Sequence, residues 1–128
     1  MKSYTDLEQS KKLAGFLPLE SADMCFNISQ RSNMPPLMTP YSKFNEFFNM
    51  ETPDFLIPCW GLVALFGLIP KYIKEHNVLR IDMDENTFAM WYDEIGYGVN
   101  LELPNIEMSE PVDTCVEMIL KLHELNLL

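Results

Sequence analysis

Residues 58–70, PCWGLVALFGLIP, contain no charged side chain and no amphipathic alternation. Nearly every face of this segment must therefore leave water, whichever backbone conformation it adopts. It is too short to cross a bilayer, because a membrane-spanning helix needs about 20 apolar residues. We expect a buried helix at 58–68, with Trp60 anchoring its start and Gly61 and Ala64 permitting close backbone approach. A charge in its centre, as in Val63→Asp, is then expected to unfold the protein.

The segments that follow have the period of β-strands. Residues 78–84 and 87–93 each alternate apolar and polar side chains, which predicts two half-buried strands joined by a turn at Glu85 and Asn86. One register then brings the apolar side chains of both strands to one face. A third strand at 98–103 continues the pattern. The expected apolar face joins Met83, Ile81 and Leu79 to Phe88, Met90 and Tyr92, and these to Leu103, Leu101 and Val99.

Three further elements are expected on either side of this region. A capping box of Thr5 and Glu8 begins a helix at about 6–14, which Gly15 ends. Alternation at 22–29 predicts a strand, which we expect to join the same sheet. Residues 111–125 form an amphipathic helix with a Glu117–Lys121 pair on its polar side. Its inward side chains are Val112, Cys115, Val116, Ile119 and Leu122.

These elements predict one α+β domain over residues 1–128. Its sheet has three to four antiparallel strands, and the buried central helix, the N-terminal helix and the C-terminal helix pack on one face. A Pro/Phe-rich insertion occupies about 30–57, with a short helix expected near 40–49 from the spacing of Phe44, Phe47 and Phe48. Residues 71–76 are expected to be a helical turn or a connection.

The net charge of −10 is concentrated in the C-terminal part of the chain. Residues 77–128 hold two basic side chains, Arg80 and Lys121, and eleven acidic ones, a net charge of −9. Such a surface disfavours nucleic acid and anionic membranes and favours basic partners. The alternative is that the charge serves solubility only.

Three blocks of the sequence resemble segments of a known protein family. They are YTDLEQSKKL at 4–13, PCWGL at 58–62 with the closing LIP at 68–70, and PVDTCVEMILKLHE at 111–124. Together they resemble a family of small, acidic, uncharacterised proteins from gut-dwelling bacteria and their phages or mobile elements, whose counterpart of 30–57 is variable. The resemblance implies a cytoplasmic protein associated with phages or mobile DNA, and it brings no established activity or catalytic residue.

The sequence offers little for catalysis or metal binding. Residues 82–93 begin like a calcium loop, but Thr87 stands where such a loop needs glycine, and the second half reads as an apolar strand. Cys25, Cys59 and Cys115 lie in apolar patterns, which predicts reduced, buried thiols. We therefore expect a protein without enzymatic activity, metal or other cofactor.

The polar face of the predicted sheet is the strongest candidate for a site. The expected register aligns Arg80, Trp91 and Asn100 in one row, and tryptophan beside arginine is typical of interaction hot spots. The alternative is that phenylalanines of 30–57 cover Trp91. Carboxylates surround the row. The candidate residues are Arg80, Trp91, Asn100, Asp82, Asp84 and Glu85, flanked by Ala89, Asp93 and Glu102.

The function expected from the sequence is a non-enzymatic protein-interaction domain of a cytoplasmic protein. Its partner would be a basic protein, not nucleic acid or membrane, and the oligomeric state is left open. One alternative is acidic mimicry of nucleic acid, in which carboxylates imitate phosphates and inhibit a DNA-binding enzyme. Another is a small-molecule or enzymatic role, which needs a deep pocket with convergent polar groups.

Overall fold

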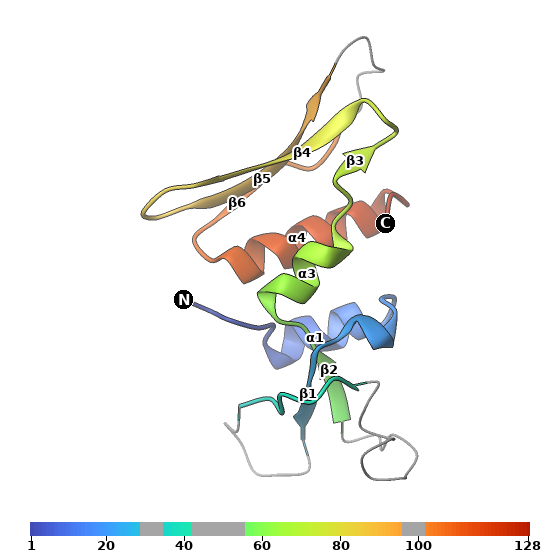
Figure 1. Cartoon of the computed structure of the whole chain (residues 1–128), viewed down its shortest axis with the longest axis vertical. Coiled ribbons are helices and arrows are strands. Elements are labelled where there is room, and N and C mark those ends of the chain that lie inside the picture. Colours follow the sequence, from blue (N-terminus) through green and yellow to red (C-terminus); the bar gives the residue numbers. More distant parts are fainter. Residues whose placement is uncertain (29–34, 42–55, 96–101) are drawn as a thin grey trace. The chain divides into compact units, whose positions relative to one another are not determined.

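The computed structural model describes residues 1–28, 35–41, 56–95 and 102–128. It divides into two compact units: an N-terminal unit, Ser3–Ala64, and a C-terminal unit, Leu65–Leu128 together with Met1–Lys2. Helices and two antiparallel sheets make the chain α+β, as expected (Figure 1). That the two units form a single domain stays a prediction.

The N-terminal unit contains a two-stranded sheet and a helix. Strand β1 (Met24–Asn27) pairs antiparallel with β2 (Leu56–Cys59), and α1 (Leu7–Ala14) packs on β2, with the 3-10 turn η1 (Leu19–Ser21) between α1 and β1 (Figure 1). The prediction that 22–29 joins the main sheet is therefore corrected, whereas the packing of the N-terminal helix on that sheet stays a prediction. The partner strand joins the end of the expected insertion, Leu56 and Ile57, to the first two residues of the expected central helix, Pro58 and Cys59. Pro58 is tolerated in β2 because, among the described strands, β2 pairs with β1 alone.

The capping box of α1 lies one residue later than expected. Asp6 is the N-cap: its Oδ1 accepts from the amide of Gln9 at 2.8 Å, and its own amide donates to Gln9 Oε1 at 3.1 Å. Thr5 is unavailable as the cap because its amide donates to the carbonyl of Trp60 at 2.9 Å. The long-range hydrogen bond therefore overrides the local Thr5–Glu8 motif.

The central helix α3 (Leu62–Leu68) is shorter than the predicted one and is not buried on every face. Leu65 is fully buried, but Val63 is 82% exposed, so the expectation that Val63 lies in the core was wrong. An apolar sequence without polar markers does not indicate which face of a short helix meets water. Trp60 does anchor the start: it is fully buried, and its Nε1 donates to Ser21 Oγ at 2.9 Å.

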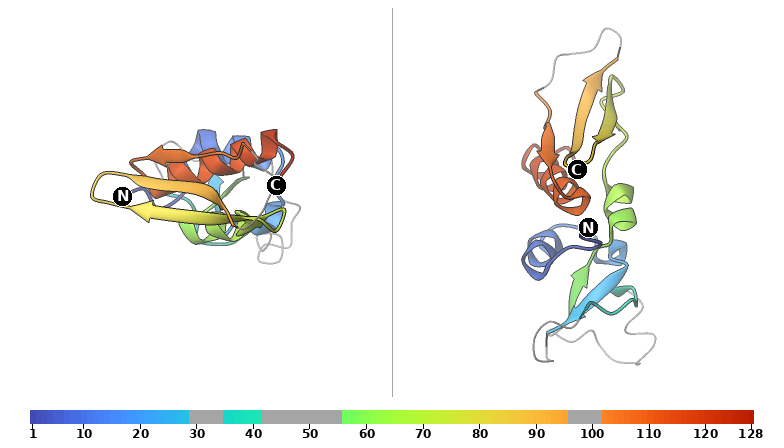
Figure 2. Two further views of the ribbon diagram at one scale, coloured as in Figure 1. Left: turned by 90° about the horizontal axis from the view of Figure 1, so that it is seen from above. Right: turned by 90° about the vertical axis from the view of Figure 1, so that its left-hand side faces the viewer.

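The C-terminal unit is built on a four-stranded antiparallel sheet in the order β3-β4-β5-β6. Its strands are β3 (Tyr72–Ile73), β4 (Asn77–Met83), β5 (Phe88–Glu94) and β6 (Ile106–Met108). Helix α4 (Pro111–Glu124) packs along β5 and β6 (Figure 2). The β4–β5 register is the predicted one. It pairs Met83 with Phe88, Ile81 with Met90 and Leu79 with Tyr92.

Two strands of this sheet differ from the prediction. Of the two alternatives for residues 71–76, a helical turn is wrong: the segment contains β3 and a tight connection to β4, in which Lys74 and Glu75 have φ of 50° and 65°. The third predicted strand, 98–103, is also corrected, because the partners of Phe88 and Met90 are Met108 and Ile106 of β6. Leu103 lies outside any strand, and Val99, Asn100 and Leu101 lie outside the described residues.

The expected inner face of α4 is confirmed. Val112, Cys115, Val116, Ile119 and Leu122 are all buried.

Contacts from α4 and α3 hold these helices on the sheet. Thr114 Oγ1 lies 3.1 Å from the carbonyl oxygen of Phe88, which ties α4 to β5, and Phe66 of α3 packs on Phe88 with ring centroids 6.2 Å apart. Lys121 pairs with Glu124 at 3.7 Å, whereas the sequence had suggested Glu117.

The short helix expected near 40–49 falls almost entirely outside the described residues. Of the insertion, residues 35–41 are described, and Leu37 exchanges two backbone hydrogen bonds with Cys25 of β1, 3.1 and 2.7 Å long. This part of the insertion therefore belongs to the N-terminal unit.

Two glycines near α3 are expected to respond oppositely to substitution by alanine. The amide of Gly61 donates to Asp23 Oδ1 at 2.7 Å, and a Cβ at Gly61 would lie 2.9 Å from Asp23 Oδ2. Gly61→Ala should therefore lower the free energy of unfolding by about 1–3 kcal/mol. At Gly67 no atom lies within 4 Å of the added Cβ, so Gly67→Ala should raise it by about 0.5–1 kcal/mol. Urea denaturation compares the two, and equal effects would contradict this packing.

The exposure of Val63 replaces the earlier expectation with the opposite one. Val63→Asp should change the free energy of unfolding by no more than about 0.5 kcal/mol, because the side chain is 82% exposed. Leu65→Ala should cost about 2–5 kcal/mol, because that side chain is fully buried. Thermal unfolding followed by circular dichroism measures both. An unfolded Val63→Asp protein would show that Val63 is covered after all.

Candidate functional site

The candidate site is the side of the sheet that faces away from α4, here called the outer face. Because side chains alternate along a strand, the register that sends Phe88 and Met90 inward sends Ala89 and Trp91 outward. Arg80 is the cross-strand partner of Trp91, as the sequence predicted. The outer face comprises Arg80, Asp82, Ala89, Trp91, Asp93, Asn105 and Glu107.

A three-residue network fixes one end of this face. Asp93 accepts hydrogen bonds from Trp91 Nε1 at 2.9 Å and, through its other oxygen, from Arg80 Nε at 3.3 Å. The side chains of Arg80 and Asp93 are 52% and 50% exposed, so this ion pair contributes at most about 1 kcal/mol to stability. The hydrogen bond to Asp93 orients the indole of Trp91 and satisfies its only polar atom, Nε1.

A groove of about 320 Å³ runs beside Trp91 across three strands. The small side chain of Ala89 lies between Asp82 of β4 and Glu107 of β6, its neighbours on the two adjacent strands, and this leaves a hollow. Asp82, Glu107 and Asn105 are exposed. The full lining is Asp82, Asp84, Thr87, Ala89, Trp91, Asn105 and Glu107.

Asn105 and Glu107 were missed by the sequence analysis, which expected Asn100 and Glu102 in their places. Extending the β5–β6 register from Ala89 and Glu107 by two residues brings Asn105 opposite Trp91. The error follows from the misplaced third strand. The alternation of Ile106, Glu107 and Met108 was the available signal, but residues 98–103 alternate as well.

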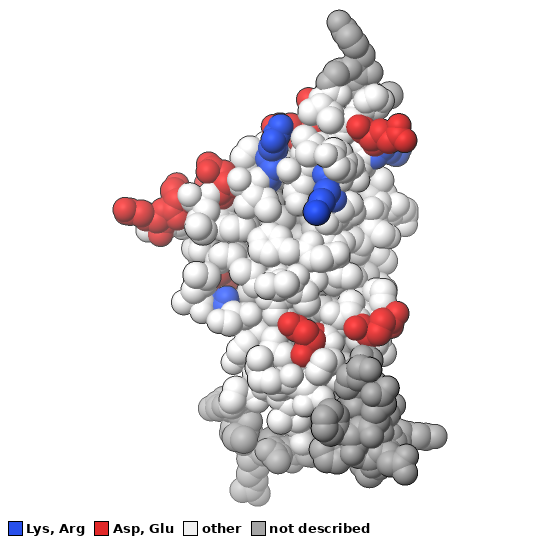
Figure 3. Space-filling model, viewed as in Figure 1, with Lys and Arg blue, Asp and Glu red and all other residues white. Residues whose placement is uncertain are grey.

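At the tip of the β4–β5 hairpin, Asp84, one of the predicted interaction residues, has a structural role. Asp84 Oδ1 accepts from the amides of Asn86 and Thr87, both at 2.8 Å, and its pKa is lowered chiefly by the backbone hydrogen bond from Asn86. This carboxylate therefore stays ionised and holds the turn. Figure 3 shows acidic side chains gathered at the tip between β4 and β5, where Asp82, Asp84 and Glu85 lie.

In the described part of the chain, no three His, Cys, Asp or Glu residues form a group that could hold a metal ion.

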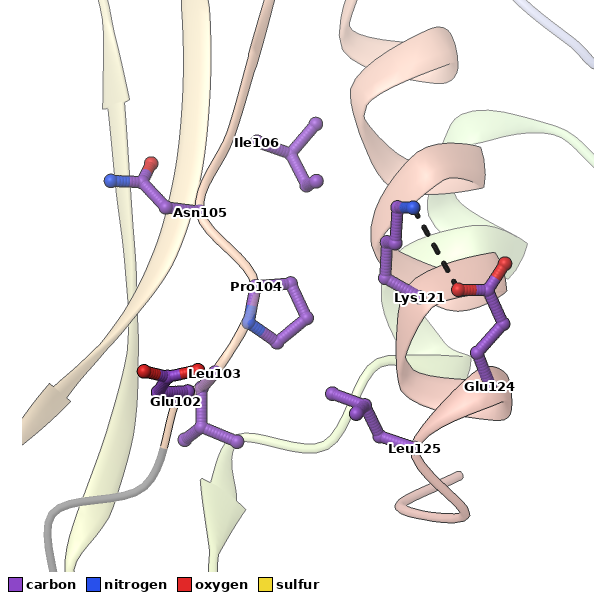
Figure 4. Close-up of a pocket in the computed structure, with 8 residues that line it drawn as sticks. All are labelled: Glu102, Leu103, Pro104, Asn105, Ile106, Lys121, Glu124 and Leu125. Atoms are coloured by element: carbon purple, nitrogen blue, oxygen red, sulfur yellow. Dashed lines mark ion pairs between the residues drawn. The ribbon is translucent and has the colours of Figure 1, made fainter.

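A second hollow of about 280 Å³ lies between residues 102–106 and the end of α4 (Figure 4). Pro104 and Ile106 point toward α4, while Asn105 points away from it (Figure 4). The Lys121–Glu124 ion pair lines the helical side. The lining combines the apolar Leu103, Pro104, Ile106 and Leu125 with Glu102, Asn105 and the paired Lys121 and Glu124.

The three thiols are buried and free, as the sequence predicted. Burial raises the pKa of Cys59 to about 11 and that of Cys115 to about 12, and it raises the pKa of Cys25 as well. Since the thiolate is the nucleophile, these side chains are poorly suited to covalent catalysis at neutral pH.

Comparison of the chain with protein-family models, with curated proteins and with solved structures found no match. None of the described helices is both long enough and apolar enough to span a membrane. The resemblance to phage-associated proteins therefore stays a prediction, and the geometry of the outer face is what bears on function.

The raised thiol pKa values predict slow chemical modification. At pH 8 a thiol with a pKa near 11 is ionised to roughly one part in a thousand. The folded protein should therefore show no rapid reaction with Ellman's reagent, while unfolding in guanidinium should release all three thiols. One equivalent reacting within seconds in the folded protein would reveal an activated cysteine and favour an enzymatic role.

Proposed function

We propose that the chain is a non-enzymatic protein-interaction domain that binds a basic partner protein through the outer face. The observation that carries the proposal is the half-buried Trp91, which is oriented by Asp93 and lies beside an acidic groove. Tryptophan and arginine are over-represented among the residues that dominate binding energy at protein interfaces. Here Trp91 and Arg80 are cross-strand neighbours on the outer face.

The charge distribution supports a basic partner. Both basic side chains of residues 77–128 are already paired, Arg80 with Asp93 and Lys121 with Glu124. Within the described residues, no basic group forms an ion pair with Asp82 or Glu107 of the groove. Unpaired carboxylates at such a surface attract basic proteins and repel the phosphates of nucleic acids and membranes.

Burial of the thiols supports a role without covalent catalysis. Following the resemblance described above, we further propose that the protein is cytoplasmic and associated with phages or mobile elements. The groups that the groove offers are a hydrogen-bonded indole, an amide and exposed carboxylates, and these are suited to binding a partner.

Affinity capture tests the proposed function. The immobilised protein should retain one or more basic proteins from bacterial lysate. Trp91→Ala combined with Asp82→Lys and Glu107→Lys should abolish retention, because it removes the aromatic anchor and reverses the charge of the groove. Asp84 is left unchanged because its carboxylate holds the hairpin turn.

The matched control is Glu8→Lys with Glu20→Lys, which reverses two exposed carboxylates in the N-terminal unit. This control should retain the same proteins as the unaltered chain. Equal retention by the outer-face variant, with a native circular dichroism spectrum, would contradict the proposal.

A further inference from the structure

We propose that the groove beside Trp91 receives an arginine side chain of the partner protein. This inference depends on the proposed function and adds the chemistry of recognition. The volume of about 320 Å³ lies at the lower end of the range for ligand pockets, roughly 300–1,000 Å³. The groove therefore has room for one long side chain rather than for a folded element.

Three groups of the groove match a guanidinium group. Trp91 provides one aromatic wall, and because its Nε1 already donates to Asp93, the surface it offers a ligand is the ring. Asp82 and Glu107 provide exposed carboxylates on the two strands beside Ala89. A planar cation that stacks on an indole and donates in parallel to carboxylates satisfies both features at once.

Arginine fits this arrangement better than lysine. A guanidinium group is planar, less strongly hydrated than an ammonium group and able to donate to two oxygens in fixed geometry. On the outer face itself, Arg80 donates one hydrogen bond from Nε to Asp93 Oδ2 at 3.3 Å, and it is the cross-strand partner of Trp91. Asn105, opposite Trp91, adds a side-chain amide whose oxygen can accept a further hydrogen bond.

The test follows the indole N–H signals of the folded, ¹⁵N-labelled full chain by NMR. The chain has two tryptophans, and the buried Trp60 serves as an internal reference for Trp91. Three heptapeptides are titrated in low salt: acetyl-Gly-Arg-Gly-Arg-Gly-Arg-Gly amide, the same peptide with lysine, and the same peptide with citrulline, the neutral isostere of arginine. The arginine peptide should move the Trp91 signal saturably and leave the Trp60 signal in place.

The expected order of affinity is arginine, then lysine, then citrulline. Asp82→Asn with Glu107→Gln should weaken binding of the arginine peptide by about twofold to thirtyfold, as expected for two exposed charge pairs. Glu8→Gln with Glu20→Gln changes the net charge equally and should leave the affinity within about twofold. An unmoved Trp91 signal, equal affinity for lysine and arginine, or equal weakening by the two double variants would each overturn the inference.

The two proposals can fail separately. If basic proteins are captured through the outer face but the arginine peptide leaves Trp91 unmoved, the arginine assignment is wrong and the proposed function stands. If the peptide binds in the groove but the affinity capture is insensitive to Trp91, Asp82 and Glu107, the recognition chemistry stands and the proposed function is wrong.

Discussion

The register of the β4–β5 hairpin is the constraint on which the rest of the C-terminal unit depends. With Met83 opposite Phe88, the pleat sends Phe88 and Met90 toward α4 and sends Asp82 and Trp91 to the outer face. A slip of one residue would exchange the two faces completely. Two hydrogen-bonding groups oppose such a slip. The Asp84 carboxylate closes the turn, and Thr114 of α4 hydrogen bonds to the carbonyl of Phe88.

This register separates the residues that stabilise the unit from those available for binding. On the inner face, Phe66 packs on Phe88, and Cys115 Sγ lies 3.9 Å from Met90 Sδ. Burial of such side chains contributes on the order of 1.5–3 kcal/mol each. On the outer face, the exposed Arg80–Asp93 pair contributes far less. The composition of the outer face is therefore less constrained by burial than that of the inner face.

Buried polar contacts between distant segments organise the N-terminal unit. Thr5 Oγ1 lies 2.7 Å from Ser10 Oγ and accepts from the amide of Trp60 at 3.2 Å, and the indole of Trp60 donates to Ser21. A buried polar group without a partner is costly, and among the described residues every buried side-chain nitrogen or oxygen has one. These contacts join α1, η1 and the residue after β2. They explain why Thr5, which a local motif assigned to capping, has another role.

The sequence by itself determined the features that depend on periodicity within one segment: the hairpin register, the inner face of α4, and the adjacency of Arg80 and Trp91. Only the tertiary structure decided the partner of β1, the exposure of Val63, and the use of β6 instead of 98–103. Both candidates for the third strand alternate, so periodicity could not choose between them. The choice depends on long-range packing and hydrogen bonding, and it brings Asn105 and Glu107 to the groove.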